Sequence, residues 1–411
     1  MNLFILNNPE NDEVLSALTD FKKNKETSSY FKAARGLLKF AMERAVTENT
    51  LFEYVVRFIL SDGRLQGKEP DESAGGFPLD GAYMEYVRYD IETFMDEFLF
   101  FDFDKLCASL NIPFIERFPK GDAQSVSGAC LRSFETLCKT TRETFPSFLI
   151  NHAKRFGCGD TALYAAFNWN GESLVPIKTI DPIRFENLTG LEAQKEVIIS
   201  NTRAHLNGRA ANNILLTGGA GTGKSSCVKA CLNMFCDDGL KLAEISRENL
   251  KTLPRLMEVL AQCRGHFIIF IDDLSFESGD MLYKSLKTAL DGQMALQSPN
   301  VIIYATSNRR HLIRESWNDR RGGEVEEIHK NDTVSEKLSL SSRFGINLYF
   351  LTPNQTEYIE IVKNLLREKG VEMTDEIKTK ALSWELNYNG RSGRTAKQFV
   401  RDYLAQDMEV L

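Results

Sequence analysis

The sequence predicts an α/β protein, with a parallel five-stranded sheet core between a mainly helical N-terminal region and a helical C-terminal segment. Apolar residues recur at helical spacing between residues 12 and 60 and again beyond residue 353. Between these regions, short apolar segments alternate with helix-length segments, a pattern typical of parallel strands joined by crossover helices. The expected strands are Asn213–Thr217, Lys241–Ile245, Phe267–Ile271, Val301–Thr306 and Ile346–Leu351.

The chain length indicates more than one domain, because 411 residues exceed what one hydrophobic core usually supports. A segment with two prolines, 171–184, marks the expected boundary before the sheet. Three helices are expected at the C-terminal end, at 354–369, 374–387 and 392–407. We therefore expect a mainly helical domain at 1–178, an α/β domain at 179–352 and a helical domain at 353–411.

The composition disfavours a membrane-spanning protein and a largely disordered one. Hydrophobic residues make up 43% of the chain, and apolar runs such as 267–271 are far shorter than the roughly 20 residues of a membrane helix. The start of the chain has no basic leader before a long apolar stretch, so we expect a cytoplasmic protein. The 8 cysteines form no Cys-x-x-Cys pair, which predicts reduced, mostly buried thiols and no zinc site.

Negative charge is concentrated in the N-terminal region. Residues 1–178 contain 26 Asp and Glu against 20 Lys and Arg, whereas 179–411 contain 31 against 30. Such an acidic surface repels phosphate backbones, which disfavours extended nucleic-acid binding by this region. It does not exclude a local basic patch elsewhere. Its acidic and aromatic segment, Asp71–Asp104, is either a partner-binding surface or a helix with a buried aromatic side and a solvated acidic side. We assign it no function.

A glycine-rich loop follows the first expected strand and precedes a helix. It fits the pattern Gly-x-x-x-x-Gly-Lys-Ser, in which glycines let backbone N–H groups surround phosphates and the lysine neutralises the β- and γ-phosphates. The serine hydroxyl of this pattern ligates Mg²⁺. A glycine-rich turn without a ligand is the alternative, which the flanking strand and helix disfavour. The residues are Gly218, Gly219, Ala220, Gly221, Thr222, Gly223, Lys224, Ser225 and, at the start of the helix, Ser226.

Polar residues end two further strands of the expected sheet. Asp272 and Asp273 follow the run 267–271, and ligands of open α/β sheets bind at the carboxyl ends of strands. Asp272 is expected to hold the Mg²⁺, and Asp273 to orient the attacking water of phosphoryl transfer. A simple turn is the alternative, which the preceding glycine-rich loop disfavours. Asn308 ends the next strand and is expected either to reach the γ-phosphate and the water or to form a turn.

The segment before the glycine-rich loop resembles AAA+ ATPases. Phe185–Glu192 is similar to the stretch that wraps the adenine in that family, which implies that Leu188 and Gly190 contact ATP. The resemblance also implies that Asn308 is the first of the family's two sensors of the γ-phosphate.

Two arginines match further motifs of the AAA+ family. Ser341–Phe344 resembles the arginine-finger box, which implies that Arg343 completes the site of a neighbouring subunit in a homo-oligomer. Ser392–Arg394 resembles the second sensor, which implies that Arg394 reaches the phosphates from a helical lid. Together these motifs extend the resemblance over residues 185–411.

A narrower resemblance covers roughly residues 156–411. It is to a bacterial AAA+ family catalogued as domain of unknown function eight hundred and fifteen, whose name supplies no substrate. Residues 1–155 match it weakly. The Asp-Asp pair is also similar to that of bacterial replication initiators, which makes a DNA-related role an analogy to consider. The narrower resemblance rests on Phe156–Gly159, Ala165–Trp169, Asn201–Thr202 and Ser307–Leu312.

These features favour an ATPase that uses ATP and Mg²⁺ to drive conformational change on a protein or nucleic-acid partner. The alternative is a nucleotide-gated scaffold or DNA-associated loader that binds ATP with little turnover. Peptide threading is disfavoured, because residues 246–256 contain no aromatic side chain. A small-molecule kinase is disfavoured, because sensor-type groups surround the phosphates. The basic run Arg309–Arg321 is either a nucleic-acid contact or a solvated, subunit-facing loop.

Overall fold

The protein forms two compact units in the computed structural model. The first comprises Met1–Ala165 with Cys263–Gly265, and the second comprises Ala166–Gln262 with His266–Leu411. Across the part of the chain that the structure describes, no helix has the length and apolar character needed to cross a bilayer. The described residues are 2–44, 49–66, 81–113, 140–177, 179–275, 286–287, 290, 298–308, 342–388 and 390–407.

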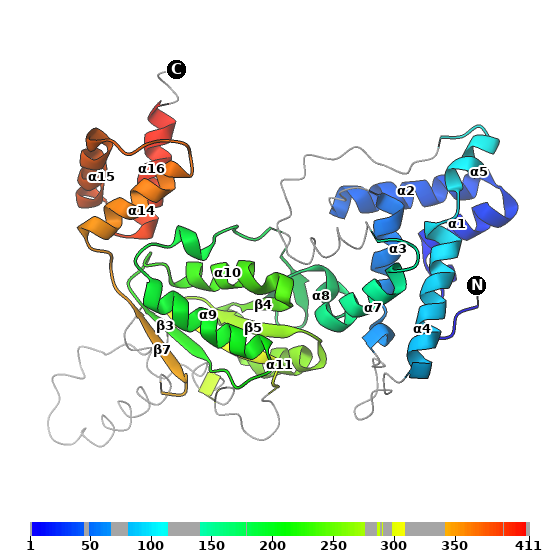
Figure 1. Cartoon of the computed structure of the whole chain (residues 1–411), viewed down its shortest axis with the longest axis horizontal. Coiled ribbons are helices and arrows are strands. Elements are labelled where there is room, and N and C mark those ends of the chain that lie inside the picture. The colour runs from blue at the N-terminus through cyan, green and yellow to red at the C-terminus, as the bar shows by residue number, and fades with distance from the viewer. Residues whose placement is uncertain are drawn as a thin grey trace. The chain divides into compact units, whose positions relative to one another are not determined.

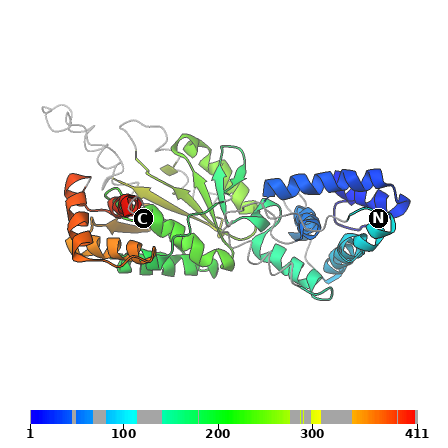
Figure 2. The same cartoon turned by 90° about the horizontal axis from the view of Figure 1, so that it is seen from above.

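The first unit is helical throughout its described part (Figures 1 and 2). Asp12 begins the first helix by accepting hydrogen bonds from the backbone N–H groups of Val14 and Leu15, which have no partner within the helix. The buried carboxylate of Asp90 accepts three backbone N–H groups from residues 4–6 and so fixes the N-terminal segment. The helices are α1 (Glu13–Asn24), α2 (Thr27–Arg44), α3 (Thr50–Leu60), α4 (Gly81–Phe94), α5 (Phe103–Ser109), α7 (Phe145–Phe156) and α8 (Asp160–Leu163).

The described part of the acidic and aromatic segment, residues 81–104, has one side in the core. Val87, Ile91 and Phe94 of α4 are fully buried, whereas Glu85 and Glu92 are exposed. This arrangement agrees in part with the amphipathic helix that the sequence offered as one of two alternatives, since Tyr86 and Tyr89 of α4 are 47% and 49% exposed and its aromatic side chains are therefore not all buried.

The second unit is built on one sheet, whose described strands follow the order β2-β1-β4-β5-β6-β3-β7. Seven strands of the described chain therefore form the sheet, and the expectation of five was wrong. The two additional strands, β1 and β2, are short and pair antiparallel, and β1 then joins the parallel set through β4. They precede the expected boundary at 178/179 but belong to the sheet. The strands are β1 (Ala166–Trp169), β2 (Leu174–Pro176), β3 (Ile214–Gly218), β4 (Leu240–Ile245), β5 (His266–Ile271), β6 (Val301–Ser307) and β7 (Ile346–Phe350).

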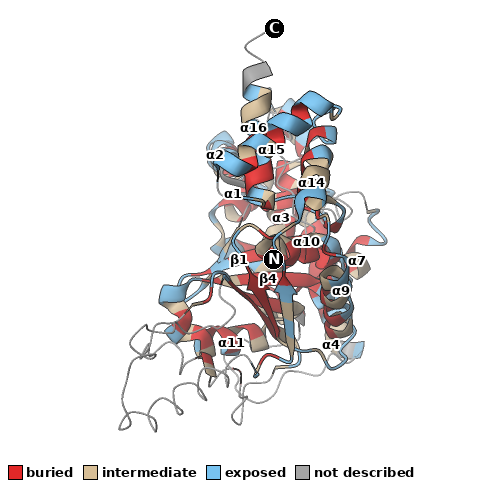
Figure 3. Cartoon of the chain, turned by 90° about the vertical axis from the view of Figure 1, so that its left-hand side faces the viewer, coloured by how far each residue is buried: buried red, intermediate tan, exposed pale blue. Residues whose placement is uncertain are grey.

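Helices cover both faces of this sheet (Figure 3). α9 (Glu192–Leu206) and α10 (Lys224–Phe235) lie together on one face, and α11 (Leu253–Gln262) lies on the other. In the parallel register Thr217 of β3 pairs with Ser307 of β6. The ends of β3, β5 and β6 therefore meet at one edge, as ligand sites of open α/β sheets require.

Three residues of the narrower resemblance, Asn201, Thr202 and Trp169, hold the core of this unit together. The amide of Asn201 donates hydrogen bonds to the carbonyl of Asn212 and to the hydroxyl of Tyr304, and Thr202 shares a third with that hydroxyl at 2.7 Å. These bonds tie α9 to β6 inside the core. Trp169 is fully buried, and its indole N–H donates to the Thr252 hydroxyl at 2.8 Å.

Three helices follow the sheet and share a hydrophobic core of their own, which includes Tyr358, Leu366, Ala381 and Phe399. They are α14 (Gln355–Arg367), α15 (Asp375–Asn387) and α16 (Gly393–Asp407), close to the predicted ranges. Asn354 and Glu357 begin α14 with a reciprocal capping box. We refer to residues 353–407 as the lid.

Candidate nucleotide site

The glycine-rich loop joins β3 to α10 in a conformation that only glycine adopts easily. Gly218, Gly221 and Gly223 have φ angles of 150°, 74° and 99°. A Cβ atom on Gly218 would lie 2.2 Å from the carbonyl oxygen of Phe350, so the loop also starts in close contact with β7. The backbone N–H groups at the start of α10 follow directly, and such a helix N-terminus favours anions.

Lys224 lies inside this loop and is only 5% exposed. Its Nζ donates to the carbonyl oxygens of Gly218 and Gly219, at 2.9 and 2.6 Å, and to Oδ1 of Asn308 at 2.9 Å. Burial lowers the pKa of the Lys224 ammonium, and the carboxylates of Asp272 and Asp273 oppose this effect. A phosphate in the loop supplies the further negative charge that a buried ammonium favours.

Asp272, at the end of β5, faces the first turn of α10. Its Oδ1 accepts hydrogen bonds from the hydroxyl of Ser225 at 2.7 Å and from the hydroxyl of Thr306 at 2.5 Å. The structure therefore brings the two predicted magnesium ligands into direct contact. Hydroxyl and carboxylate oxygens are ligands that Mg²⁺ takes, together with phosphate oxygens and water. The donor set fits that ion.

Asp273 has a left-handed backbone, with φ of 54°, and is one of few such non-glycine residues in the described chain. The side chain of Thr306 holds this conformation by accepting the Asp273 N–H at 2.9 Å. Oδ1 of Asp273 accepts a hydrogen bond of 2.7 Å from the Asn308 amide. Strained backbone of this kind persists where neighbours fix it, and it is concentrated at functional sites.

One cavity of about 1030 Å³ unites these groups with the lid. Leu188 and Gly190 line it from the segment before the loop, and Arg394 lines it from the lid. All of the glycine-rich loop from Ala220 to Ser226 borders the same space. Volumes of this size are typical of sites for small molecules and cofactors.

The lid touches the loop directly. The backbone N–H of Gly393 donates to the carbonyl oxygen of Gly221 at 3.0 Å. Gly221 has no room for a side chain, because a Cβ there would lie 2.9 Å from Oγ of Ser392 and 3.1 Å from Cβ of Arg394. The start of α16 thus packs directly against the glycine-rich loop.

The family model described as Protein of unknown function (DUF815) matches residues 162–407. The chain belongs to this family. The membership expected from the motifs is thereby confirmed, and the match contains the loop, both carboxylates and the lid of this DUF815 protein. No curated protein matches the sequence.

Several solved structures are remotely similar to this chain. RuvB of Thermotoga maritima, a Holliday junction branch migration motor, gives a TM-score of 0.33 at 14% identity, over 54% of this chain and 72% of its own. ORC1 of Aeropyrum pernix in complex with DNA gives a TM-score of 0.39 at 15% identity, over 54% of this chain and 61% of its own. A DNA replication initiation factor gives a TM-score of 0.37 at 18% identity, over 56% of this chain and 67% of its own. Similarities this remote say nothing about function.

Arg343 lies away from the cavity of the DUF815 protein. It precedes β7, which is the edge strand beside β3, and the parallel pairing of β3 and β7 puts it toward the end of the sheet opposite the loop. The sequence-predicted residues are therefore brought together in one site with the exception of Arg343. The basic run Arg309–Arg321 falls outside the described residues.

Sequence reasoning missed three residues of this site in the DUF815 protein. Thr306 contacts both aspartates, and Lys397 and Arg401 line the cavity from α16. The lid positions carry a signal, because Arg394, Lys397 and Arg401 are three and four residues apart and so share one helix face. Thr306 carries none, since its role depends on the pairing of β5 with β6.

Proposed function

We propose that this chain is a cytoplasmic AAA+ ATPase that binds ATP with Mg²⁺, hydrolyses it, and moves its lid against a macromolecular partner. One observation carries the proposal. The cavity joins a buried lysine in a phosphate loop, a pair of strand-end carboxylates and a lid arginine. Binding alone needs only the loop, whereas the carboxylate pair supplies the groups that hydrolysis needs.

Ser225 and Asp272 are the residues that would hold Mg²⁺, which supplies charge neutralisation for the β- and γ-phosphates. Lys224 adds a second positive charge next to the loop carbonyls. Leu188 and Gly190 line the same cavity, as do the apolar side chains of Ile361 and Leu365, which suit an adenine ring.

Asp273 orients the attacking water and accepts a hydrogen bond from it, while Asn308 fixes the carboxylate through its amide. The oxygen of the same amide faces Lys224, so Asn308 couples the phosphate-binding cation to the water-positioning carboxylate. Arg394 approaches the phosphates from the lid. Nucleotide in the cavity therefore contacts both the sheet and the lid. Its hydrolysis removes the γ-phosphate and with it the contacts between that phosphate and the lid.

Multiple-turnover phosphate release tests the proposal. The wild-type protein should release phosphate with Mg²⁺ and ATP, and Lys224→Ala should lose ATP affinity in calorimetry. Lys229→Ala removes a lysine from the same helix outside the cavity and should change neither quantity. If ATP binds but no phosphate is released above the Lys224→Ala background, the chain is a nucleotide-gated scaffold or loader and the proposal fails.

The site is shared between subunits in this proposal. Arg343 is not among the residues that line its own cavity, and it precedes β7, the edge strand of the described sheet, where a neighbouring copy can approach. Head-to-tail contacts of this kind close into rings or extend as spirals. An arginine finger supplied in trans raises hydrolysis by about 10³ to 10⁵.

Arg343→Ala should therefore lose turnover while keeping ATP affinity. Mixing it with Lys224→Ala should restore activity, because some mixed interfaces combine an intact loop with an intact arginine. Turnover per subunit should also rise with protein concentration. Concentration-independent turnover by a species that light scattering shows to be monomeric with ATP would exclude the shared site.

A further inference from the structure

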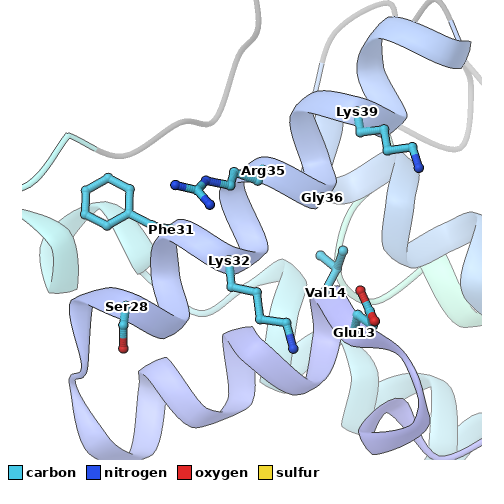
Figure 4. Close-up of a pocket in the computed structure, with 8 residues that line it drawn as sticks. All are labelled: Glu13, Val14, Ser28, Phe31, Lys32, Arg35, Gly36 and Lys39. Carbon is cyan, nitrogen blue, oxygen red and sulfur yellow. The ribbon is translucent and has the colours of Figure 1, made fainter.

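A second cavity, of about 520 Å³, lies in the helical unit between α1 and α2 (Figure 4). Gly36 lets the two helices approach, because a Cβ atom there would lie 2.4 Å from Cγ2 of Val14. We call this cavity the α1/α2 groove. Its lining residues are Glu13 and Val14 of α1 and Ser28, Phe31, Lys32, Arg35, Gly36 and Lys39 of α2.

Three cations lie along one side of the groove. Lys32, Arg35 and Lys39 are three and four residues apart, so they share one face of α2 over about 10 Å of helix. All three are exposed. Figure 4 shows Lys32 extending between the helices and Arg35 reaching toward the ring of Phe31.

These cations differ from four other basic residues of the unit. Within the described residues, Lys22, Arg57, Arg64 and Arg142 each pair with a carboxylate. The structure contains no ion pair or hydrogen bond of Lys32, Arg35 or Lys39 side chains among those same residues. Three like charges along one groove repel one another, and an anionic ligand removes that repulsion.

The groove also offers an aromatic platform. Phe31 is 47% exposed, although apolar rings of this size are usually buried. Its ring is braced edge-on by Tyr30, with centroids 5.7 Å apart. A cationic groove with an exposed ring beside it is the arrangement that binds single strands, because phosphates contact the cations and a base stacks on the ring.

We propose that the α1/α2 groove binds single-stranded nucleic acid, with phosphates on Lys32, Arg35 and Lys39 and a base on Phe31. The exposed ring favours this ligand over an acidic peptide, which needs the cations but gains little from stacking. Duplex DNA is disfavoured, because its bases are already stacked. The proposal is independent of ATP hydrolysis by the second unit.

The acidic balance of this region does not oppose the proposal, because salt screens charges beyond about 8 to 10 Å and only nearby groups act on a bound phosphate. One carboxylate lines the groove, that of Glu13. It opposes an anionic ligand, so Glu13→Gln should strengthen binding. A merely structural role of Glu13 predicts no such gain.

Fluorescence anisotropy of a labelled oligothymidylate with the full chain, without nucleotide, tests the groove. Lys32→Glu with Arg35→Glu should weaken binding at least tenfold. The slope of log affinity against log salt should become shallower by about 1.4, or about 0.7 for each phosphate that is no longer neutralised. Phe31→Leu keeps an apolar side chain without the ring and should weaken binding roughly fivefold or more.

Lys23→Glu is the matched control, because this exposed lysine of α1 lies outside the groove. It reverses one lysine charge, as the Lys32→Glu half of the double variant does, and should leave both affinity and slope near wild type. Circular dichroism of each variant verifies the fold. Equal affinity of the Lys32/Arg35 variant and the Lys23→Glu control overturns the proposal. The proposal is also overturned if Phe31→Leu keeps the wild-type affinity for oligothymidylate and binds polyglutamate more tightly than oligothymidylate.

Discussion

Nζ of Lys224 donates a hydrogen bond to Oδ1 of Asn308 at 2.9 Å, and so connects the phosphate loop to the end of β6. The Nδ2 atom of the same amide donates to Asp273 at 2.7 Å. In the proposed mechanism, one side chain thus holds both the cation that binds phosphate and the carboxylate that positions water. Because the amide has one orientation that satisfies both bonds, the two groups are placed together.

Asp273→Asn should leave ATP affinity nearly unchanged and lower turnover at least tenfold. The neutral side chain keeps an Oδ1 acceptor for Asn308, and asparagine tolerates the left-handed backbone that Asp273 adopts. Only the negative charge that orients the water is lost, which is a transition-state effect. Phosphate release and calorimetry measure the two quantities.

Asp375→Asn, on the lid outside the cavity, serves as the control and should keep wild-type turnover. Wild-type turnover in Asp273→Asn would show that a different carboxylate positions the water. Glu277 follows closely in the sequence and would then be the first residue to replace.

Thr306→Val should raise the Mg²⁺ concentration that half-maximal turnover requires. It should also lower the free energy of unfolding by about 1 to 3 kcal/mol. Valine keeps the shape of this 1% exposed side chain but removes the hydroxyl that donates to Asp272 and accepts from the Asp273 N–H. Thr306→Ser retains the hydroxyl and should recover both properties. Mg²⁺ titration of turnover and urea unfolding provide the measurements, and equal behaviour of Val and Ser variants would contradict the role.

The strands and the lid were predictable because their signals are local. Each parallel strand is a short apolar run, and each lid helix begins at a capping residue such as Asn354 or Thr374. The glycine-rich loop was predictable because its chemistry requires a fixed sequence of residue types.

β1 and β2 were missed for a physical reason. Ala166–Trp169 and Leu174–Pro176 are short, and the second ends in a proline within a segment that has the composition of a linker. What makes β1 a strand is its pairing with β4, which lies more than 60 residues later in the chain, and β2 pairs in turn with β1. Thr306 was missed likewise, since only the neighbouring strand β5 gives its hydroxyl a partner.

Gly221→Ala should reduce turnover at least tenfold, because the added methyl group would collide with Ser392 and displace α16 from the loop. Gly208→Ala provides the control. Its φ of 66° is similar to the 74° of Gly221, but nothing lies within 4 Å of a Cβ at that position. Gly208→Ala should therefore lose about 1 to 2 kcal/mol of stability through backbone strain and keep its turnover. Similar turnover in both variants would show that the lid contact is unimportant.

Acidification should destabilise the second unit through His205. Burial, with a smaller effect of His266, lowers the pKa of His205 to about 4, against 6.5 for the unperturbed group. The unfolded chain then binds more protons between these values, so the free energy of unfolding falls as the pH falls below 6.5. Between pH 7 and pH 5 the loss should be about 2 kcal/mol.

His205→Phe removes the titrating group while keeping a ring against His266, whose centroid lies 4.8 Å from that of His205. Urea unfolding at pH 8, where His205 is neutral in both states, measures the part of the substitution's effect on the free energy of unfolding that does not depend on pH. The variant should lose about 2 kcal/mol less than the wild type on going from pH 7 to pH 5. Parallel pH profiles would exclude His205 as the source.

β7 has a consequence for communication within an assembly. One end of this strand follows Arg343, and the other end, at Phe350, abuts Gly218 with no space for a Cβ. Five extended residues span about 16 Å and cannot stretch. In the proposed assembly, a neighbouring subunit that displaces the Arg343 end of β7 would therefore also displace Gly218, so β7 would couple the subunit contact mechanically to the nucleotide site.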